Sequence, residues 1–339
     1  MSDESDQIRW RKPLNSNGTS RIDVLKQRHI IRKAVREYLD NEDFIEIDSP
    51  LLVRGTTPEV GVESFAVGDH YLATSTEYQM KRLAIGGFKK IYSLTQNFRP
   101  GDLSTYRNPE FTMLEWGRVG EPMSKIEEDA ENFTLSAMAK LDLPETITYQ
   151  GHKVDMRKPW ERISVSKAVH RITGASIDDF ELSSFRKAVE AAGITVREQW
   201  AEDYDFLFSV LMDYVQERLG FEKPVFLCDW PMFQTTSAKG KDDGKTAERS
   251  ELFIAGVEVG DGFAGLIDAS LQATLFENAL KTRKKNNQPA VELDYKYLAA
   301  MRSGAPSGAG MAIGFDRLVM VLTDQPCIKN VLTLGWDEL

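Results

Sequence analysis

The sequence contains little cysteine and little histidine. Only Cys228 and Cys327 occur among its 339 residues, so neither a disulfide framework nor the spacing of a zinc site is present. The four histidines are dispersed, and they lie outside the motifs described below, at positions 29, 70, 152 and 170. The sequence therefore gives no sign of a reaction that depends on a cysteine or histidine side chain.

Long apolar runs are also absent. The mean hydropathy is −0.36, and no apolar run approaches the eighteen or so residues that a membrane-spanning helix needs. The first twenty residues, MSDESDQIRWRKPLNSNGTS, lack the apolar core of a signal peptide. We therefore expect a cytoplasmic protein, and we predict that the polar residues 1–20 form a disordered tail.

Excess positive charge is missing as well. The formal net charge is −10, which argues against a surface that neutralises many phosphates and makes tRNA an unexpected partner. The densest basic group, residues 281–285, is typical of a solvated helix face. In contrast, 42% of the residues are hydrophobic and 10% aromatic, so the chain can bury a large core.

The pattern of apolar residues predicts one α+β domain over residues 21–339. Residues 21–40 have a helical period and precede a strand-like segment, FIEIDSPLLV, that carries Pro50. Residues 71–119 and 251–268 alternate like antiparallel strands, whereas a mostly helical insertion is expected around 120–220. We expect a mainly antiparallel sheet flanked by helices. The apolar stripe of the first helix comprises Ile22, Leu25, His29, Ile30, Ala34, Val35, Tyr38 and Leu39.

Residues 98–118, FRPGDLSTYRNPEFTMLEWGR, are typical of a long hairpin. Because side chains alternate along a strand, Phe111, Met113, Glu115 and Gly117 should share one face. An aromatic platform, a carboxylate and Arg99 would then border one space. The alternative is that Arg99 and Glu115 form an ordinary surface ion pair and Phe111 belongs to the core.

The C-terminal segment SGAGMAIGFDRLVMVLT predicts a glycine-interrupted strand followed by a helix. Asp316 and Arg317 would lie in the first turn of that helix. Backbone amides at a helix N-terminus and a nearby guanidinium favour a phosphate. The alternative is close strand packing beside a surface arginine.

The segment ERSELFIAGVEVGDGFAGLID supplies two candidate magnesium ligands, Glu251 and Glu258. Seven residues separate them, so a regular strand would send their side chains to opposite faces. Shared coordination therefore requires a bulge, which we predict at Gly256. The alternative is a pair of solvent-facing glutamates.

Two segments of the sequence are similar to nucleotide-binding motifs but do not match them. GKDDGKT, residues 240–246, has three residues between its glycines where a phosphate-binding P-loop has four. GAGMAIG has one residue too many before its last glycine, and no βαβ unit surrounds it. Neither a P-loop nor a dinucleotide-binding fold is expected.

Taken in order along the chain, these elements resemble class II aminoacyl-tRNA synthetases, specifically the lysyl branch. The likeness rests on TSTEYQMKRLAIGGFKKIYSLTQNFR, RNPEFTMLEW, AERSELFIAGVEVGDGF and IGFDRLVMVLT, and it spans about residues 21–335. Only about twenty residues precede the first motif, whereas the lysyl enzymes carry an anticodon-binding domain there. The chain is therefore most similar to the free-standing paralogues that ligate (R)-β-lysine to elongation factor P.

The resemblance implies ATP and Mg²⁺ as cofactors, with Arg99 and Arg317 as catalytic residues that clamp phosphate charge. Phe111 would stack on adenine, Asn108 would contact ATP, and Glu77 and Glu115 would hold substrate ammonium groups. The implied ATP-binding residues are Arg99, Pro100, Gly101, Asn108, Phe111, Glu258, Val259, Gly314 and Arg317. The implied substrate-binding residues are Ser75, Thr76, Glu77, Glu115, Gly117, Asp261 and Gly265. Glu251 and Glu258 would bind the metal.

The sequence departs from the family at the substrate pocket. The family has tyrosine at Gly117, asparagine at Asp261 and a second glutamate at Gly265. Pro100 and Gly101 also replace residues of an ATP-contacting loop, and Asp102 could take over the role of the lost carboxylate. A larger or differently charged amino acid than lysine could occupy the space that the two glycines leave.

The resemblance implies an ATP-dependent ligase that forms an aminoacyl-adenylate and transfers the acyl group to an amine. The first candidate acceptor is a lysine of elongation factor P, and a homodimer is expected. One alternative is an amino-acid-activating ligase of small-molecule biosynthesis. Another is a non-catalytic regulator that binds tRNA or a synthetase. The presence of Arg99, Arg317, Glu251 and Glu258 favours an enzyme.

Overall fold

The computed structural model describes residues 10–14, 18–101 and 103–339. Much of the tail predicted over residues 1–20 therefore lies outside the described residues, as does Asp102. Within the described part of that tail Pro13 pairs with Ser20, and the Trp10 ring lies 4.5 Å from the guanidinium of Arg21, the residue that follows the tail.

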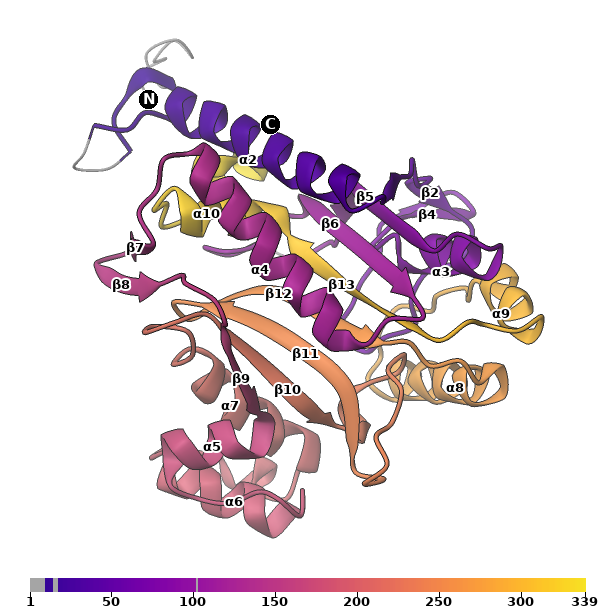
Figure 1. The fold of residues 1–339 in the computed structure, drawn as a ribbon. Coiled ribbons are helices and arrows are strands. Elements are labelled where there is room, and N and C mark those ends of the chain that lie inside the picture. The colour runs from indigo at the N-terminus through magenta and orange to yellow at the C-terminus, as the bar shows by residue number, and fades with distance from the viewer. Residues whose placement is uncertain (1–9, 15–17, 102) are drawn as a thin grey trace.

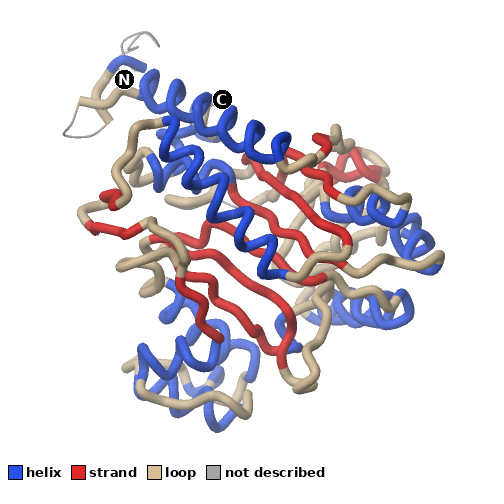
Figure 2. Tube along the Cα trace, in the orientation of Figure 1, coloured by secondary structure: helices blue, strands red, loops and turns tan. Residues whose placement is uncertain are grey.

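An eight-stranded sheet runs through the centre of the molecule (Figure 2). Its neighbours are antiparallel except at the two edges, where β1 is parallel to β5 and β9 is parallel to β10. The predicted α+β fold with a mainly antiparallel sheet is confirmed. In order across the sheet the strands are β1 (Ile45–Glu46), β5 (Lys90–Phe98), β6 (Glu110–Val119), β13 (Gly308–Gly314), β12 (Val257–Ala264), β11 (Thr246–Ile254), β10 (Val225–Pro231) and β9 (Glu161–Ser164).

Helices cover both faces of this sheet. One face packs against α2 (Arg21–Asn41), α4 (Met123–Lys140) and α10 (Phe315–Leu322), and the main hydrophobic core lies between these layers (Figure 1). Leu114 and Trp116 of β6 point into that core. The opposite face carries a cavity. It is bordered by α3 (Glu77–Ile85), α9 (Tyr295–Arg302) and a small sheet of β2 (Leu52–Val53), β4 (His70–Leu72) and β3 (Ala66–Val67), with α8 (Ala269–Lys285) beside α9.

The predicted first helix is α2, which begins at a capping box formed by Ser20 and Asp23. Its buried stripe differs from the predicted one, because Val24 and Ile31 are buried whereas His29 is exposed. Helix α2 packs against α4, and Val24 and Ile31 lie on its buried face. The apolar residues in the sequence form a stripe wider than this face, so the helical period alone did not place the buried side. Pro50 lies between β1 and β2, not within a strand.

The remaining elements are a group of helices beside the edge strand β9 and a separate two-stranded sheet of β7 and β8. Helices α5, α6 and α7 form a second hydrophobic cluster with β9 and β10 (Figure 1). No helix among the described residues is long and apolar enough to cross a membrane. The bounds are β7 (Thr146–Tyr149), β8 (His152–Asp155), α5 (Val165–Thr173), α6 (Leu182–Ala191) and α7 (Tyr204–Gln216), with short 3-10 turns at Glu198–Trp200, Met232–Gln234, Ile328–Val331 and Trp336–Glu338.

Candidate active site

Two rows of residues cross the central sheet on the face that carries the cavity. Directly paired residues on neighbouring antiparallel strands point to the same face, so each row presents its side chains together. The first row is Ser93, Glu115, Ala312, Asp261 and Glu251. The second row is Ile91, Gly117, Gly310, Phe263 and Arg249. The predicted alternation of Phe111, Met113, Glu115 and Gly117 follows directly from this register.

A cavity of about 550 Å³ lies above these rows. Most of the residues that the sequence implicated line it together: Ser75, Glu77, Arg99, Asn108, Phe111, Glu115, Gly117, Glu258, Val259, Asp261, Gly265, Gly314 and Arg317. Four do not line it, namely Thr76, Pro100, Gly101 and Glu251. Thr76 is fully buried beside Glu115, and Pro100 and Gly101 belong to the hairpin loop. The predicted contacts of these three residues with substrate or ATP stay predictions.

One end of the cavity carries the two arginines. The Arg99 guanidinium lies 5.4 Å from the centre of the Phe111 ring, and its Nη2 is 3.3 Å from the Thr74 carbonyl oxygen. Arg317, in the first turn of α10 as predicted, donates from Nη1 to the Glu258 carbonyl oxygen at 2.8 Å. Both guanidiniums thus retain donors for an anion, and Phe111 offers a flat apolar surface between strand and loop.

Asn108 lies at the same end but already uses both ends of its amide. Its Nδ2 donates to the Glu110 carbonyl oxygen at 2.6 Å, and its Oδ1 accepts from the Trp336 amide at 3.0 Å. In this structure Asn108 therefore fixes the end of the hairpin loop to the C-terminal segment. Its contact with ATP stays a prediction.

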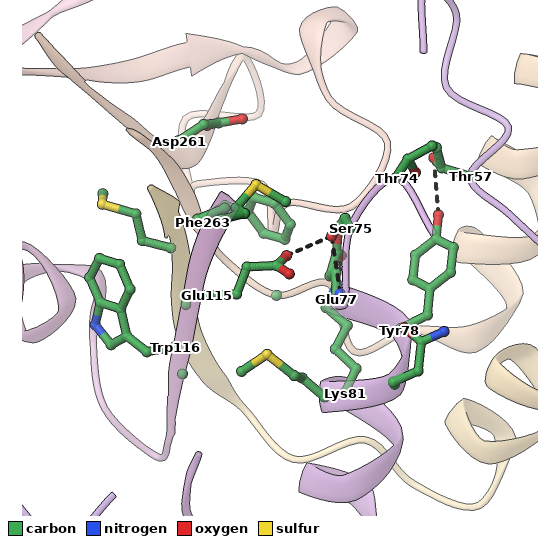
Figure 3. A pocket seen from close by; sticks show the side chains of 18 of the residues that line it. Thr57, Thr74, Ser75, Glu77, Tyr78, Lys81, Glu115, Trp116, Asp261 and Phe263 are labelled. Carbon is green, nitrogen blue, oxygen red and sulfur yellow. Dashed lines mark hydrogen bonds and ion pairs between the residues drawn. The ribbon is translucent and has the colours of Figure 1, made fainter. Parts of the chain in front are cut away.

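Glu115 is held by the turn that begins α3. Its Oε1 accepts from the Ser75 hydroxyl at 2.6 Å, and its Oε2 accepts from the Thr76 amide at 2.6 Å and from the Thr76 hydroxyl (Figure 3). Burial raises the pKa of Glu115, while these three donors oppose the rise. Glu115 does not pair with Arg99, so the alternative of a surface ion pair is wrong.

The next carboxylate, Glu77, forms an ion pair within α3. Lys81 lies one helical turn later, and its Nζ is 2.7 Å from Glu77 Oε1. The same ammonium is 4.9 Å from the centre of the Phe263 ring and 5.8 Å from that of Tyr297. Burial alone would lower the pKa of Lys81, but Glu77 and Tyr297 together outweigh this effect, so the pKa is raised. Lys81 therefore stays charged inside the cavity.

A second ion-pair network lies at the β11 and β12 strands. Arg249 donates from Nε to Asp261 at 3.0 Å and from Nη2 to Glu251 at 2.7 Å, while Gln216 donates to the other Glu251 oxygen at 2.8 Å. Burial raises the pKa of Glu251, Arg249 opposes the rise, and repulsion from Asp261 and Glu258 adds to it. Asp261 and Glu251 thus share one guanidinium, and the charge of Glu258 adds to the crowding of carboxylates beside it.

The predicted bulge exists, but its position was wrong. Glu251 and Glu258 lie on different strands, and Gly256 makes the tight turn between them with a φ of 77°. The register shifts further along, because Phe253 pairs with Glu258 whereas Leu252 pairs with Gly260. The extra residue on β12 brings Glu251, Glu258 and Asp261 to one face, which resolves the odd spacing.

The predicted magnesium pair is not preassembled. Both Glu251 oxygens accept hydrogen bonds, and Glu258 Oε2 lies 3.3 Å from Arg317 Nη1. In the described part of the chain, no three His, Cys, Asp or Glu side chains are grouped as a set of metal ligands. The crowding of carboxylates nevertheless suits a divalent cation that also binds phosphate oxygens, so these residues fit Mg²⁺ and the site stays a prediction.

Three charged residues of the site were missed at the sequence level. Lys81 could have been found from the four-residue spacing to Glu77, and Arg249 from its alternation with Glu251 on one strand. Glu59 had no such signal, because it lies in the loop TTPEVGVES. The fold brings Glu59 into the cavity, where its carboxylate accepts from the Thr236 hydroxyl at 2.8 Å.

Comparison with known proteins places this geometry in a family. The family model described as tRNA synthetases class II (D, K and N) matches residues 9–337. The chain is 33% identical over 325 residues to a Lysine--tRNA ligase of Chloroflexus aurantiacus, covering 92% of this chain and 64% of that protein. It is 34% identical over 320 residues to the Lysine--tRNA ligase of Carboxydothermus hydrogenoformans, covering 91% and 64%.

A third relative, the Lysine--tRNA ligase of Clostridium acetobutylicum, is 32% identical over 322 residues, covering 91% of this chain and 62% of that protein. The chain thus spans a little under two thirds of the length of these relatives. The family model, by contrast, covers nearly all of the chain, and the large antiparallel sheet flanked by helices agrees with it. The chain belongs to the class II tRNA synthetase family (D, K and N), and its fold is that of the class II catalytic domain.

Proposed function

We propose that the chain is an ATP-dependent amino-acid ligase that forms an aminoacyl-adenylate and transfers the acyl group to an amine. One observation carries this proposal. One cavity has two arginines and an aromatic platform at one end, and the anchored Glu115 lies further inside it. A nucleoside triphosphate and an amino acid would therefore meet inside this cavity, with the amino-acid carboxylate directed at the phosphates.

In the first step, a carboxylate oxygen of the amino acid attacks the α-phosphorus of ATP. The bond from that phosphorus to the bridging oxygen breaks, and pyrophosphate leaves with the electron pair. Two anions must approach each other, so Arg99 and Arg317 stabilise charge in the transition state and Glu115 positions the ammonium. Bound magnesium, held by Glu251 and Glu258, would neutralise further phosphate charge.

In the second step, an amine attacks the carbonyl carbon of the adenylate. The bond from that carbon to the phosphate oxygen breaks, AMP leaves with the electron pair, and the amine nitrogen loses a proton to solvent. The products are an amide and AMP. No histidine or cysteine lines the cavity in the described part of the chain, and adenylate chemistry needs neither.

The first candidate acceptor is a lysine of an elongation factor P-like protein. The sequence resemblance supports this acceptor, and the net charge of −10 disfavours a large nucleic-acid surface. The relatives are named as tRNA ligases, which favours tRNA as the competing acceptor. These two acceptors differ chemically, since tRNA would yield an ester and lysine an amide.

Amino-acid-dependent exchange of labelled pyrophosphate into ATP tests the first step. Each amino acid is supplied separately with Mg²⁺, and exchange with at least one is expected. Transfer of the labelled amino acid to purified elongation factor P, total tRNA or small amines then tests the second. Alkali-stable label on the protein supports the proposed acceptor, and alkali-labile label on tRNA contradicts it. No exchange with any amino acid, despite ATP binding, would favour the non-catalytic alternative.

A further inference from the structure

The floor of the cavity beyond Glu115 is a strip of bare backbone. Gly117 pairs directly with Gly310 on the neighbouring strand, so two residues without side chains lie next to each other. The following positions continue the strip, because the Gly265 amide donates to the Gly308 carbonyl oxygen at 3.0 Å. All four glycines line the cavity. A ligand could therefore lie flat against this part of the sheet.

Two of these glycines are required by packing and two are not. A Cβ on Gly308 would lie 2.5 Å from the Arg118 carbonyl oxygen, and one on Gly310 would lie 2.9 Å from that of Trp116. By contrast, the nearest atom to a Cβ on Gly117 is 3.4 Å away, and to one on Gly265 it is 3.7 Å away. Neither Gly117 nor Gly265 has a positive φ. The backbone therefore does not require glycine at positions 117 and 265, and the lack of a side chain at each leaves space in the cavity.

The surroundings of the strip are largely apolar. Ile91 and Phe263 flank Gly117 and Gly310 within the same row of the sheet. The cavity wall also includes Lys89, Ser307 and six apolar residues, Ala84, Ile85, Phe88, Met301, Ala305 and Pro306. Apolar walls around a flat floor favour a broad, planar apolar group, since such a group buries the most surface in contact with both.

The charges beside the strip disfavour an ionised side chain of either sign. Lys81 already neutralises Glu77, and its Nζ lies 4.0 Å from where a Cβ of Gly265 would be. A cationic side chain there would meet this ammonium, and Glu77 is already paired with Lys81. An anionic side chain would meet Glu77, Glu115 and Asp261 on its way along the cavity. Lys81 can instead face an aromatic ring, as it already faces Phe263.

We propose that the amino-acid substrate carries a large, uncharged, aromatic side chain that lies on the strip of Gly117, Gly310, Gly308 and Gly265, with its ammonium group at Glu115. This inference rests on the proposed function and names the substrate class. Lys81 and Gly265 are then specificity-determining residues, because one excludes a cation and the other leaves room for the ring.

Binding measured without reaction separates this inference from the proposed function. Phenylalanine, tyrosine, tryptophan, lysine, (R)-β-lysine and glutamate are titrated by calorimetry into the protein with Mg²⁺ and a non-hydrolysable ATP analogue. At least one aromatic amino acid should bind tenfold or more tightly than lysine, β-lysine and glutamate. Tighter binding of any of the charged three overturns the inference, even if exchange occurs. Aromatic binding without pyrophosphate exchange leaves the inference standing and contradicts the ligase function.

Filling the strip tests its role directly. Gly265→Leu should weaken binding of the aromatic amino acid at least tenfold and leave binding of the ATP analogue within threefold. Gly240→Leu is the matched control, because Gly240 lies outside the cavity and its new side chain would first meet only the movable side chain of Met232. Unchanged aromatic binding in a folded Gly265→Leu protein overturns the assignment.

Removing the internal cation tests the charge argument. Lys81→Met keeps the length of the side chain and frees Glu77, so lysine should bind at least tenfold more tightly than to the wild type. Binding of the aromatic amino acid should change by less than threefold. Glu77→Gln is the paired variant, in which lysine binding should not improve. Lysine binding that is unchanged in Lys81→Met contradicts a role for Lys81 in excluding cations.

Discussion

Arg249 and Asp261, on adjacent strands, form a bidentate ion pair in which Nε donates at 3.0 Å and Nη2 donates at 3.1 Å. The same Nη2 also donates to Glu251 at 2.7 Å, and the Cζ of Arg249 lies 4.6 Å from the centre of the Trp230 ring. The carboxylates raise the pKa of Arg249 against the cost of its burial, whereas burial raises the pKa of Asp261 although Arg249 opposes that rise. This network fixes the wall of the cavity at β12.

The first prediction is that Arg249→Met destabilises the protein by about 3 kcal/mol, because Glu251 and Asp261 lose their common partner. The free energy of unfolding, measured in urea, checks it. Arg157→Ala is the control, since the exposed Arg157 pairs with Glu145 and Asp155 at the surface and should change stability by less than about 1 kcal/mol. Equal effects of the two variants would contradict a structural role for the network.

The second prediction concerns the two arginines at the phosphate end. Arg99→Ala or Arg317→Ala should lower amino-acid-dependent pyrophosphate exchange about a hundredfold or more, which corresponds to about 3 kcal/mol of transition-state stabilisation. Exchange rates at saturating ATP, with circular dichroism to confirm folding, measure the effect. The exposed Arg197 serves as the matched control. Near-normal exchange in a folded Arg99→Ala protein would exclude the proposed clamp.

Local patterns predicted much of the fold and the nucleotide end of the site. The alternation around Phe111 and Glu115, and the helix start at Arg317, depend on periods of two and 3.6 residues that a sequence displays directly. The bulge at Glu258 could not be placed in the same way, because it depends on how β11 and β12 pair. Glu59 enters the cavity from a loop without any period, so only the tertiary fold reveals it.

The third prediction concerns pH. Burial, helped by repulsion from Glu77, raises the pKa of Glu59 above its ordinary value. Below the ordinary pKa of a glutamate, the carboxyl of Glu59 is protonated in both the folded and the unfolded state. As the pH rises, the unfolded state loses this proton first. The contribution of Glu59 to stability therefore falls as the pH rises through its raised pKa.

Glu59→Gln removes this proton linkage but keeps an oxygen for the Thr236 hydroxyl. The free energy of unfolding of Glu59→Gln should therefore improve relative to the wild type between pH 4.5 and pH 8. Glu198→Gln, at an exposed position, should show no such change. If wild type and Glu59→Gln respond identically to pH, the carboxyl of Glu59 is not desolvated as we infer.

The fourth prediction is a homodimer. β1 lies at the edge of the central sheet, and two apolar residues beside this edge, Ile45 in β1 and Leu52 in β2, are 54% and 51% exposed. A symmetric partner would cover this edge and the apolar groups beside it. Light scattering at micromolar concentration should report about twice the chain mass of 38.3 kDa. A monomer that still supports pyrophosphate exchange would refute the dimer.

The last prediction is that placing the family's residues at the altered pocket positions restores activation of lysine. Gly117→Tyr, Gly265→Glu and Asp261→Asn are combined, and a Cβ at either glycine would meet no atom closer than 3.4 Å. A glutamate at 265 would begin 4.0 Å from Lys81 Nζ, so it can pair with Lys81 and release Glu77 for a substrate ammonium.

A buried ammonium that regains a carboxylate and a tyrosine hydroxyl recovers about 2 to 5 kcal/mol of charge-assisted hydrogen bonding. Exchange dependent on lysine or β-lysine should therefore rise at least tenfold in the triple variant, while exchange with the wild-type substrate falls. Comparing the triple variant with Gly265→Glu alone shows whether the release of Glu77 is the main contribution. If the unmodified protein already activates lysine or β-lysine at micromolar concentrations, other residues compensate for the glycines, and the inferred change of specificity is wrong.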